Sequence, residues 1–491
     1  MTLKKRFVLF CILSFIFLLA IDQSILAQAN LQFPSQKELE KLSMKEWNNQ
    51  IRREKFDLVL PEAMRKYGVD MWIHVMRESI PDRFGEEDLG SASGVFVFTD
   101  RGEGRIERAV LGRRWGATQR ERDEGDVRFL EECGAYDIIR DPVFVMEPVS
   151  SPMTEYDYRF KGLREFVEER DPKVIAVNYR NNLGPWPTLR RINDGISFTD
   201  HRLLIRELGE KYAGRLISSE YVMMHYQITP VQSEIKLLRK FRNDELKLVE
   251  KAFNDIKPGV SRVSEIGETG NYEVDIVVFR RMRTGQSQRG RSAGWENSVV
   301  QGGDIVAAPS QGMFAYVLRE GEDGPPPEIQ RLWNEYLRID KILAETVQAA
   351  RTPRKIISDY KEKFQEAGII VVEPQLHMFQ PKNNFPVYSL GMDPEKTKIS
   401  IDMHGKGKGA TSEKHDIYLG PRIGSYGPDW VLDIPLQPNH HFVLEYFFYM
   451  PSPGPADMDQ YLFFWNHEQA LATSEGVEYL SPPQKELILI R

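Results

Sequence analysis

Three segments near the C-terminal end of the chain decide the fold: MHGKGK at residues 403–408 with His415 behind it, FVLE at residues 442–445, and Glu468 shortly before ATSEGV at residues 472–477. FVLE begins an apolar run that has the length and composition of a buried strand. An unpaired charge inside such a strand is costly, so we expect its glutamate to have a partner. The three segments together indicate a polar site inside a β-rich region.

A long helix and two short segments upstream fall in order with these segments. Apolar residues recur at helical spacing over residues 231–256, and Pro230 stands at a favourable helix start. KPG at residues 257–259 ends this helix. SEI at residues 233–235, at the start of this helix, and GDIV at residues 303–306 complete the ordered set of segments.

Taken in order, the segments resemble the creatinase, prolidase and aminopeptidase P family, the pita-bread metallopeptidases. The resemblance implies an α/β creatinase-like N-terminal domain followed by an α+β pita-bread domain. It also implies hydrolysis of peptides with proline in the second position, two divalent ions (Mn, Co or Zn) and a homodimer. At the matching positions, Glu445 and Glu468 would hold metal, while His404 and His415 would orient the substrate and assist proton transfer.

The set of metal ligands that the family uses is incomplete in this sequence. The family binds its ions with two aspartates, one histidine and two glutamates, a set of hard oxygen donors with one imidazole. No aspartate stands at residues 307–319, where two ligands are expected, and Lys408 occupies the histidine position. An ammonium group cannot ligate and repels a dication. A further family histidine is absent from residues 290–297, and only Glu445 and Glu468 remain of the five ligands.

Several arrangements of the remaining side chains are open at this point. Lys408 either replaces the metal electrostatically, by neutralising Glu445 and Glu468, or is a solvated loop lysine. His404 and His415 either form a residual single-metal site with the two glutamates or are ordinary hydrogen-bonded histidines. We expect a degenerate, metal-deficient and non-catalytic family member that keeps a peptide-binding cleft. The alternative is an active, metal-dependent Xaa-Pro peptidase.

The beginning of the chain is typical of a secretory signal peptide. Basic residues at 4–6 precede an apolar run at 7–21, and Ala27 offers a small-residue cleavage point. The run is short for a spanning helix, and an uncleaved anchor is the alternative. We expect residues 1–27 to be removed and the mature protein to be exported to the periplasm or the exterior. Cys133 is then the only cysteine, which excludes an internal disulfide.

Composition limits the number of domains and the class of partner. The chain has 491 residues, 28% of them charged and 41% hydrophobic, and a formal net charge of −7. It is too long for one compact core and too apolar for disorder. We expect a creatinase-like domain at residues 28–228 and a pita-bread domain at residues 229–491. The slight acidic excess gives no reason to expect nucleic acid or an anionic membrane surface as partner, and no later segment predicts a stable membrane insertion.

Short apolar runs alternate with helical stretches in the first half of the chain, which predicts an α/β domain. The expected strands there are residues 71–76, 95–99 and 174–178, and the expected helices are residues 159–170 and 202–211. Strands are expected in the second half at residues 274–279, 313–318, 398–403 and 442–450, with helices at residues 327–349 and 354–367.

Three other patterns in the sequence are candidate sites. Basic residues at 280–283, with Arg289 and Arg291, are either a solvated face or a site for a carboxylate terminus. The glycine-rich stretch at residues 405–411 lacks the Gly-Lys-Ser/Thr ending of a phosphate loop. The neighbouring histidines at 440–441 would point to opposite faces of a strand and are not expected to ligate together.

Overall fold

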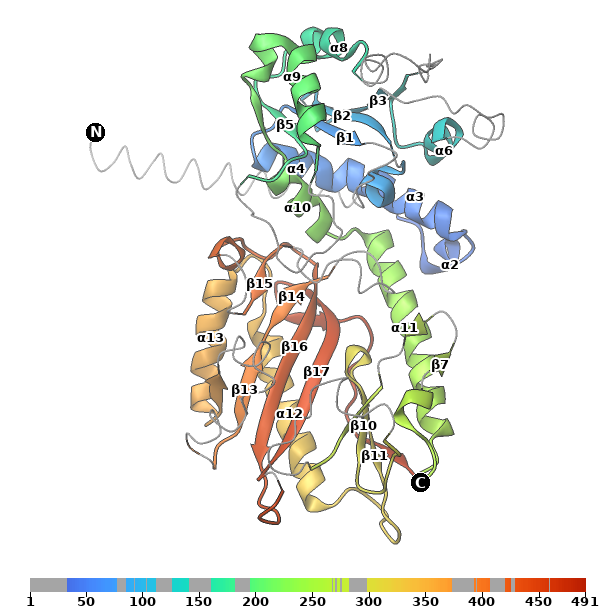
Figure 1. Cartoon of the computed structure of the whole chain (residues 1–491), viewed down its shortest axis with the longest axis vertical. Coiled ribbons are helices and arrows are strands. Elements are labelled where there is room, and N and C mark those ends of the chain that lie inside the picture. Colours follow the sequence, from blue (N-terminus) through green and yellow to red (C-terminus); the bar gives the residue numbers. More distant parts are fainter. Residues whose placement is uncertain are drawn as a thin grey trace, which may run out of the picture.

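The chain forms two parts, which Figure 1 shows one above the other, the N-terminal part in blue to green and the C-terminal part in yellow to red. The computed structural model describes residues 33–76, 85–91, 93–102, 104–111, 126–140, 160–181, 195–266, 268–269, 272–273, 276–281, 298–372, 393, 395–406, 420–424, 429–458 and 460–491. The expected leader, Lys408 and His415 lie outside these residues. Among the described helices, none is long and apolar enough to cross a membrane.

The N-terminal part is built on a mixed six-stranded sheet. Its strands are β1 (Met71–Met76), β2 (Gly94–Asp100), β3 (Ile106–Leu111), β4 (Ile138–Ile139), β5 (Ile175–Val177) and β6 (Leu216–Ser218). They lie in the order β4-β3-β2-β1-β5-β6, with β1 antiparallel to β2 and parallel to β5. The central strands are buried along nearly their whole length, as their Val, Ile and Phe content predicts.

Helices cover both faces of this sheet. They are α2 (Gln36–Leu39), α3 (Met44–Glu54), η1 (Lys55–Val59), α4 (Leu60–Lys66), η2 (Gly85–Leu89), α6 (Asp126–Cys133), α8 (Leu163–Arg170), α9 (Phe198–Ala213) and α10 (Glu220–Ile228). Successive strand residues alternate between the faces. Trp72 and Phe98 pack with α3, α4 and α10, whereas Ile73 and Val97 pack with α8 and α9. The expected α/β character of this part is confirmed.

A long helix, α11 (Gln232–Asp255), begins at the junction of the two parts and runs down beside the strands of the second (Figure 1). The expected domain boundary, between residues 228 and 229, falls between α10 and α11. The indole nitrogen of Trp47 donates to the carbonyl oxygen of Ser233 at 2.9 Å. Beside it, Lys55 Nζ lies 3.1 Å from Glu234 Oε2 in a buried ion pair. The first turn of α11 is thereby fixed to α3 and η1.

The C-terminal part contains a four-stranded sheet, in the order β19-β11-β10-β9, and a seven-stranded sheet around a long hairpin. Its strands are β7 (Glu268–Thr269), β8 (Tyr272–Glu273), β9 (Val277–Phe279), β10 (Ile305–Ala308), β11 (Met313–Val317), β12 (Ile370–Val372), β13 (Lys398–Ile401), β14 (Met403–Gly405), β15 (Arg422–Ile423), β16 (His440–Pro451), β17 (Tyr461–Ala472), β18 (Val477–Tyr479) and β19 (Ile488–Ile490). Its remaining helical segments are η3 (Val263–Glu265), η4 (Pro309–Gln311), α12 (Pro327–Thr346), α13 (Pro353–Glu366) and η5 (Asp429–Leu432).

The two faces of the β16–β17 hairpin carry different sets of side chains. Tyr446 and Phe464 lie on one face, where both rings pack against Tyr336 of α12. Because side chains alternate along a strand, Glu445 and the residue paired with it point the other way. One face of the hairpin therefore packs on α12, and the other carries Glu445 and His467 beside the rings of Phe447 and Trp465.

Candidate functional site

Three side chains from neighbouring strands converge on one face of the large sheet. Glu445 on β16 pairs in register with His467 on β17, and His404 on β14 pairs with Val443. Residues paired across strands share a face, as do residues two apart on one strand. His404 Nε2 lies 3.4 Å from Glu445 Oε2, and His467 Nε2 lies 4.0 Å from the same oxygen. A nitrogen or oxygen atom from each of the three residues lies within 4.8 Å of the other two.

This His404–Glu445–His467 cluster is accessible from one side. The side chains of His404 and Glu445 are 5% and 8% exposed, whereas that of His467 is 21% exposed. Next to His467, the ring of Trp465 lies with its centroid 5.8 Å away and stacks on Phe447 at an interplanar angle of 8°. An aromatic surface thus borders the cluster along the hairpin, and solvent reaches the cluster past His467.

Contacts behind the two histidines orient their rings. His404 Nδ1 lies 3.2 Å from the carbonyl oxygen of Gly405, and His467 Nδ1 lies 3.3 Å from Ser310 Oγ. A carbonyl oxygen can only accept, so this contact favours the proton on Nδ1 of His404. The lone pair of its Nε2 then faces Glu445. Both histidines direct Nε2 toward the same carboxylate.

A buried ion pair lies beside the cluster. Arg422 of β15, which pairs with His404 across the strands, donates from Nε to Asp402 Oδ1 at 2.8 Å. Burial raises the pKa of Asp402, and Glu445 raises it further, while Arg422 and His404 lower it. The backbone N–H of Asp402 donates to the carbonyl oxygen of Glu445 at 3.0 Å. Arg422 therefore balances one of the two acidic groups, and Glu445 faces the histidines.

The structure does not bring Glu468 together with Glu445. Glu468 pairs in register with Leu444, so it lies on the opposite face of the hairpin from its neighbour His467. Its Oε1 accepts from Arg242 Nη2 at 2.8 Å, and both side chains are almost fully buried. Burial raises the pKa of Glu468 to about 7, against the opposing effect of Arg242.

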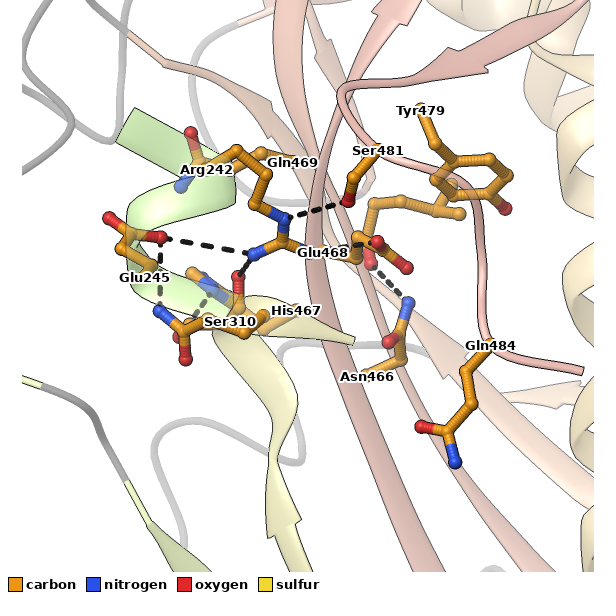
Figure 2. A network of polar contacts seen from close by, with 12 residues as sticks. Arg242, Glu245, Ser310, Asn466, His467, Glu468, Gln469, Tyr479, Ser481 and Gln484 are labelled. Atoms are coloured by element: carbon orange, nitrogen blue, oxygen red, sulfur yellow. Dashed lines mark hydrogen bonds and ion pairs between the residues drawn. The ribbon is translucent and has the colours of Figure 1, made fainter. Parts of the chain in front are cut away.

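Arg242 of α11 connects Glu468 with η4, the segment that contacts His467 (Figure 2). Its Nη1 donates to the carbonyl oxygen of Ser310 at 2.8 Å and lies 3.9 Å from Glu245 Oε2. Glu245 also accepts from Gln311 Nε2 at 3.3 Å, and burial raises its pKa. One buried guanidinium thus holds η4 in place, and with it the hydroxyl group that contacts His467.

The hairpin of β10 and β11 supplies no carboxylate to the cluster within the described residues. β10 is wholly apolar, and Ser310 in η4 occupies the turn that faces His467. Asp304, just before β10, accepts from the backbone N–H of Gln301 at 2.8 Å and from Arg280. Arg281, also from the basic cluster of the sequence, pairs with Glu328. Both arginines have partners within the protein.

The two-ion centre that the family resemblance implies does not fit these residues. Bridging two ions and balancing their charge takes several carboxylates, as in the five-ligand set of the family. Among the described side chains of the cluster only Glu445 carries a carboxylate, because Glu468 is bound to Arg242 on the other face. The sequence-derived roles of Lys408 and His415 stay predictions, since both residues lie outside the described part.

Two members of the site, His467 and Ser310, are not predicted from the sequence. The family resemblance points to Glu468, the carboxylate adjacent to His467, and not to His467 itself. The two-residue period that links His467 with Trp465 is the signal that could have identified it. Ser310 has no sequence signature as a histidine partner, since only the fold brings η4 against β17.

Comparison with known proteins identifies the fold. No protein-family model and no curated protein sequence matches the chain. The X-Pro aminopeptidase from Thermotoga maritima matches 87% of this chain over 100% of its own length, with a TM-score of 0.50 and 13% sequence identity. A Bacillus anthracis structure assigned as an aminopeptidase P matches 89% of this chain over 96% of its own, with a TM-score of 0.51 and 11% identity. At this identity the likeness concerns the fold, and it confirms the expected creatinase-like and pita-bread architecture.

Proposed function

We propose that this protein is a peptide-binding homologue of the Xaa-Pro peptidases that has lost their two-metal hydrolytic centre. The observation that carries the proposal is the residue opposite Glu445: it is a histidine, and the carboxylate next to it is bound to Arg242 on the other face. Two-metal hydrolysis requires carboxylates that bridge and clamp the ions. The fold remains, while among the described residues this chemistry lacks its carboxylate ligands.

Peptides with a free N-terminus and proline in the second position are the proposed ligands. The matched structure from Thermotoga maritima is named an X-Pro aminopeptidase, and its fold extends over most of this chain. In this protein, Glu445 offers a carboxylate to a peptide ammonium, and the partly exposed His467 and Trp465 lie at the accessible side. A charge-assisted hydrogen bond of this kind contributes about 1.5–3 kcal/mol.

Peptide binding and peptide hydrolysis can be measured separately. Labelled Xaa-Pro tripeptides would be titrated into the purified protein by fluorescence anisotropy in the presence of a chelator, and product formation would be followed by mass spectrometry with and without added Mn, Co or Zn. We expect saturable binding without turnover. Glu445→Gln should weaken binding about tenfold or more, the loss of a charge-assisted hydrogen bond. Glu362→Gln, an exposed change on α13, is the matched control.

The alternative function is metal-dependent Xaa-Pro hydrolysis, and the convergence of His404, Glu445 and His467 is the observation that favours it. Metal-dependent turnover that disappears in Glu445→Gln would establish this alternative. Absence of both binding and turnover would reject a peptide ligand altogether.

Export and dimer formation belong to the same proposal. Removal of residues 1–27 would be tested by N-terminal sequencing of the protein recovered from the periplasm or the medium. Light scattering of the purified protein would give the oligomeric state. An intact leader on the recovered protein would exclude its removal, and a monomeric mass would exclude the dimer.

A further inference from the structure

We propose that His404, Glu445 and His467 bind a single divalent transition-metal ion, with Zn²⁺ as the best match. This site differs from the arrangement expected from the sequence, because it uses His467 in place of Glu468 and needs no ligand from β10 or η4. It goes beyond the proposed peptide binding and does not depend on it.

The geometry of the cluster is close to that of a tetrahedral site. Bonds of about 2.0–2.1 Å at tetrahedral angles place ligand atoms about 3.3 Å apart. The His404–Glu445 separation is 3.4 Å, and the His467–Glu445 separation is 4.0 Å. His467 has the more exposed side chain of the two histidines, so the ligand that must move is also the one with room to move.

The donor set selects the kind of ion. Two imidazoles and one carboxylate form the ligand set of several zinc hydrolases, in which a water molecule takes the fourth position. Mg²⁺ and Ca²⁺ prefer sites made of oxygen ligands. Arg422 balances Asp402 beside the cluster, and Glu445 supplies the carboxylate oxygen that completes this mixed nitrogen and oxygen donor set.

Contacts behind the ligands support a metal site independently of the distances. A histidine that ligates through one nitrogen usually hydrogen-bonds a protein group through the other, which fixes its ring. His404 contacts the Gly405 carbonyl oxygen through Nδ1, and His467 contacts Ser310 Oγ through Nδ1. Both rings are held with Nε2 toward Glu445. Arg242 in turn holds Ser310 through its carbonyl oxygen.

The test is metal binding to the full-length protein without peptide. Zn²⁺ would be titrated by calorimetry after chelator treatment, metal content would be measured by elemental mass spectrometry, and Co²⁺ would be added for its visible absorption. We expect one ion per chain and a tetrahedral Co²⁺ spectrum. His467→Ala and Glu445→Gln should weaken Zn²⁺ binding at least about 100-fold, and Ser310→Ala about tenfold, the range of outer contacts.

Two variants make the test specific. Glu468→Gln should retain the ion, because Glu468 lies on the other face of the hairpin, and His201→Ala, a histidine change in the N-terminal part, is the matched control. Circular dichroism would show that each variant is folded. Binding lost in Glu468→Gln but kept in His467→Ala would overturn the proposal in favour of the sequence-derived site. A wild-type protein that binds no Zn²⁺ would also overturn the proposal. If Lys408→Ala alone bound Zn²⁺, the ammonium group of Lys408 would take the place of the ion in the wild type.

Failure of this proposal is distinguishable from failure of the proposed function. Peptide binding is measured with chelator present, and metal binding is measured without peptide. Either result can therefore be negative while the other is positive.

Discussion

Replacing Arg242 by methionine removes the charge that faces Glu468 while keeping a long apolar side chain in the same space. Arg242 donates to Glu468 at 2.8 Å and to the Ser310 carbonyl oxygen at 2.8 Å, and both charged side chains are almost fully buried. Removing one member of a buried pair costs about 3–5 kcal/mol of unfolding free energy, because the other charge stays in a poor environment.

Proton uptake by Glu468 sets the expected value within this range. Burial already raises its pKa to about 7, so the unpaired group takes up a proton near neutral pH and relieves part of the cost. We expect Arg242→Met to lower the unfolding free energy by about 3 kcal/mol at pH 7, the lower end of the range for broken buried pairs. Glu468→Gln keeps an acceptor for the guanidinium and should cost about 1 kcal/mol.

Urea unfolding of the wild type, the two single variants and the double variant gives the coupling energy between the side chains. Tryptophan fluorescence would follow unfolding. The curve would be fitted with two transitions, one for each part of the molecule. A real pair should show a coupling of about 1–2 kcal/mol, since residues in direct contact are not additive. Effects that add to within about 0.5 kcal/mol would refute the assignment of Glu468 to Arg242.

Three further predictions concern pH, backbone strain and the junction of the two parts. Burial raises the pKa of Asp340 from 3.8 to about 6, so the folded state binds this proton more tightly than the unfolded state does. The unfolding free energy should therefore fall by about 3 kcal/mol as the pH rises from about 4 to above 6. In Asp340→Asn the urea midpoint should change less across this pH range. Gly312 has φ +58°, and an added Cβ would clash with a carboxylate oxygen of Glu468. Gly312→Ala should therefore cost about 2–4 kcal/mol in the same assay, and a change under 0.5 kcal/mol would show that Glu468 moves freely. Lys55→Met should destabilise by about 3–5 kcal/mol by leaving Glu234 unpaired, with partial recovery in Lys55→Met/Glu234→Gln; equal stability of the two variants would exclude the pair.

Most elements of the fold followed from periodicity. The expected strands at residues 71–76 and 442–450 correspond to β1 and β16, and the helix expected over residues 231–256 is α11. These segments have long, consistent apolar patterns, and such patterns largely determine the secondary structure without knowledge of the tertiary fold. β17 was not among the expected strands, because His467 and Glu468 interrupt its aromatic run.

The site was less predictable for a physical reason. Side chains alternate along a strand, so an assignment that is wrong by one residue moves a ligand to the other face of the sheet. Glu468 and His467 illustrate this, since only the register with β16 shows which of them faces Glu445. The positions of Ser310 and Arg242 depend on contacts between segments far apart in the chain, which one sequence does not reveal.

A short stretch of α11 is attached at one end to the N-terminal part and at the other end to the C-terminal part. This stretch couples the two parts of the molecule mechanically. Ser233 is held by Trp47 of the N-terminal part, and nine residues later Arg242 is held by Ser310 and Glu468. At 1.5 Å per residue, a stiff rod of about 13 Å joins these anchor points. A rotation of the N-terminal part about this junction would therefore act on α11 as on a lever, and the displacement would reach the turn that carries Ser310 and, through it, the ring of His467.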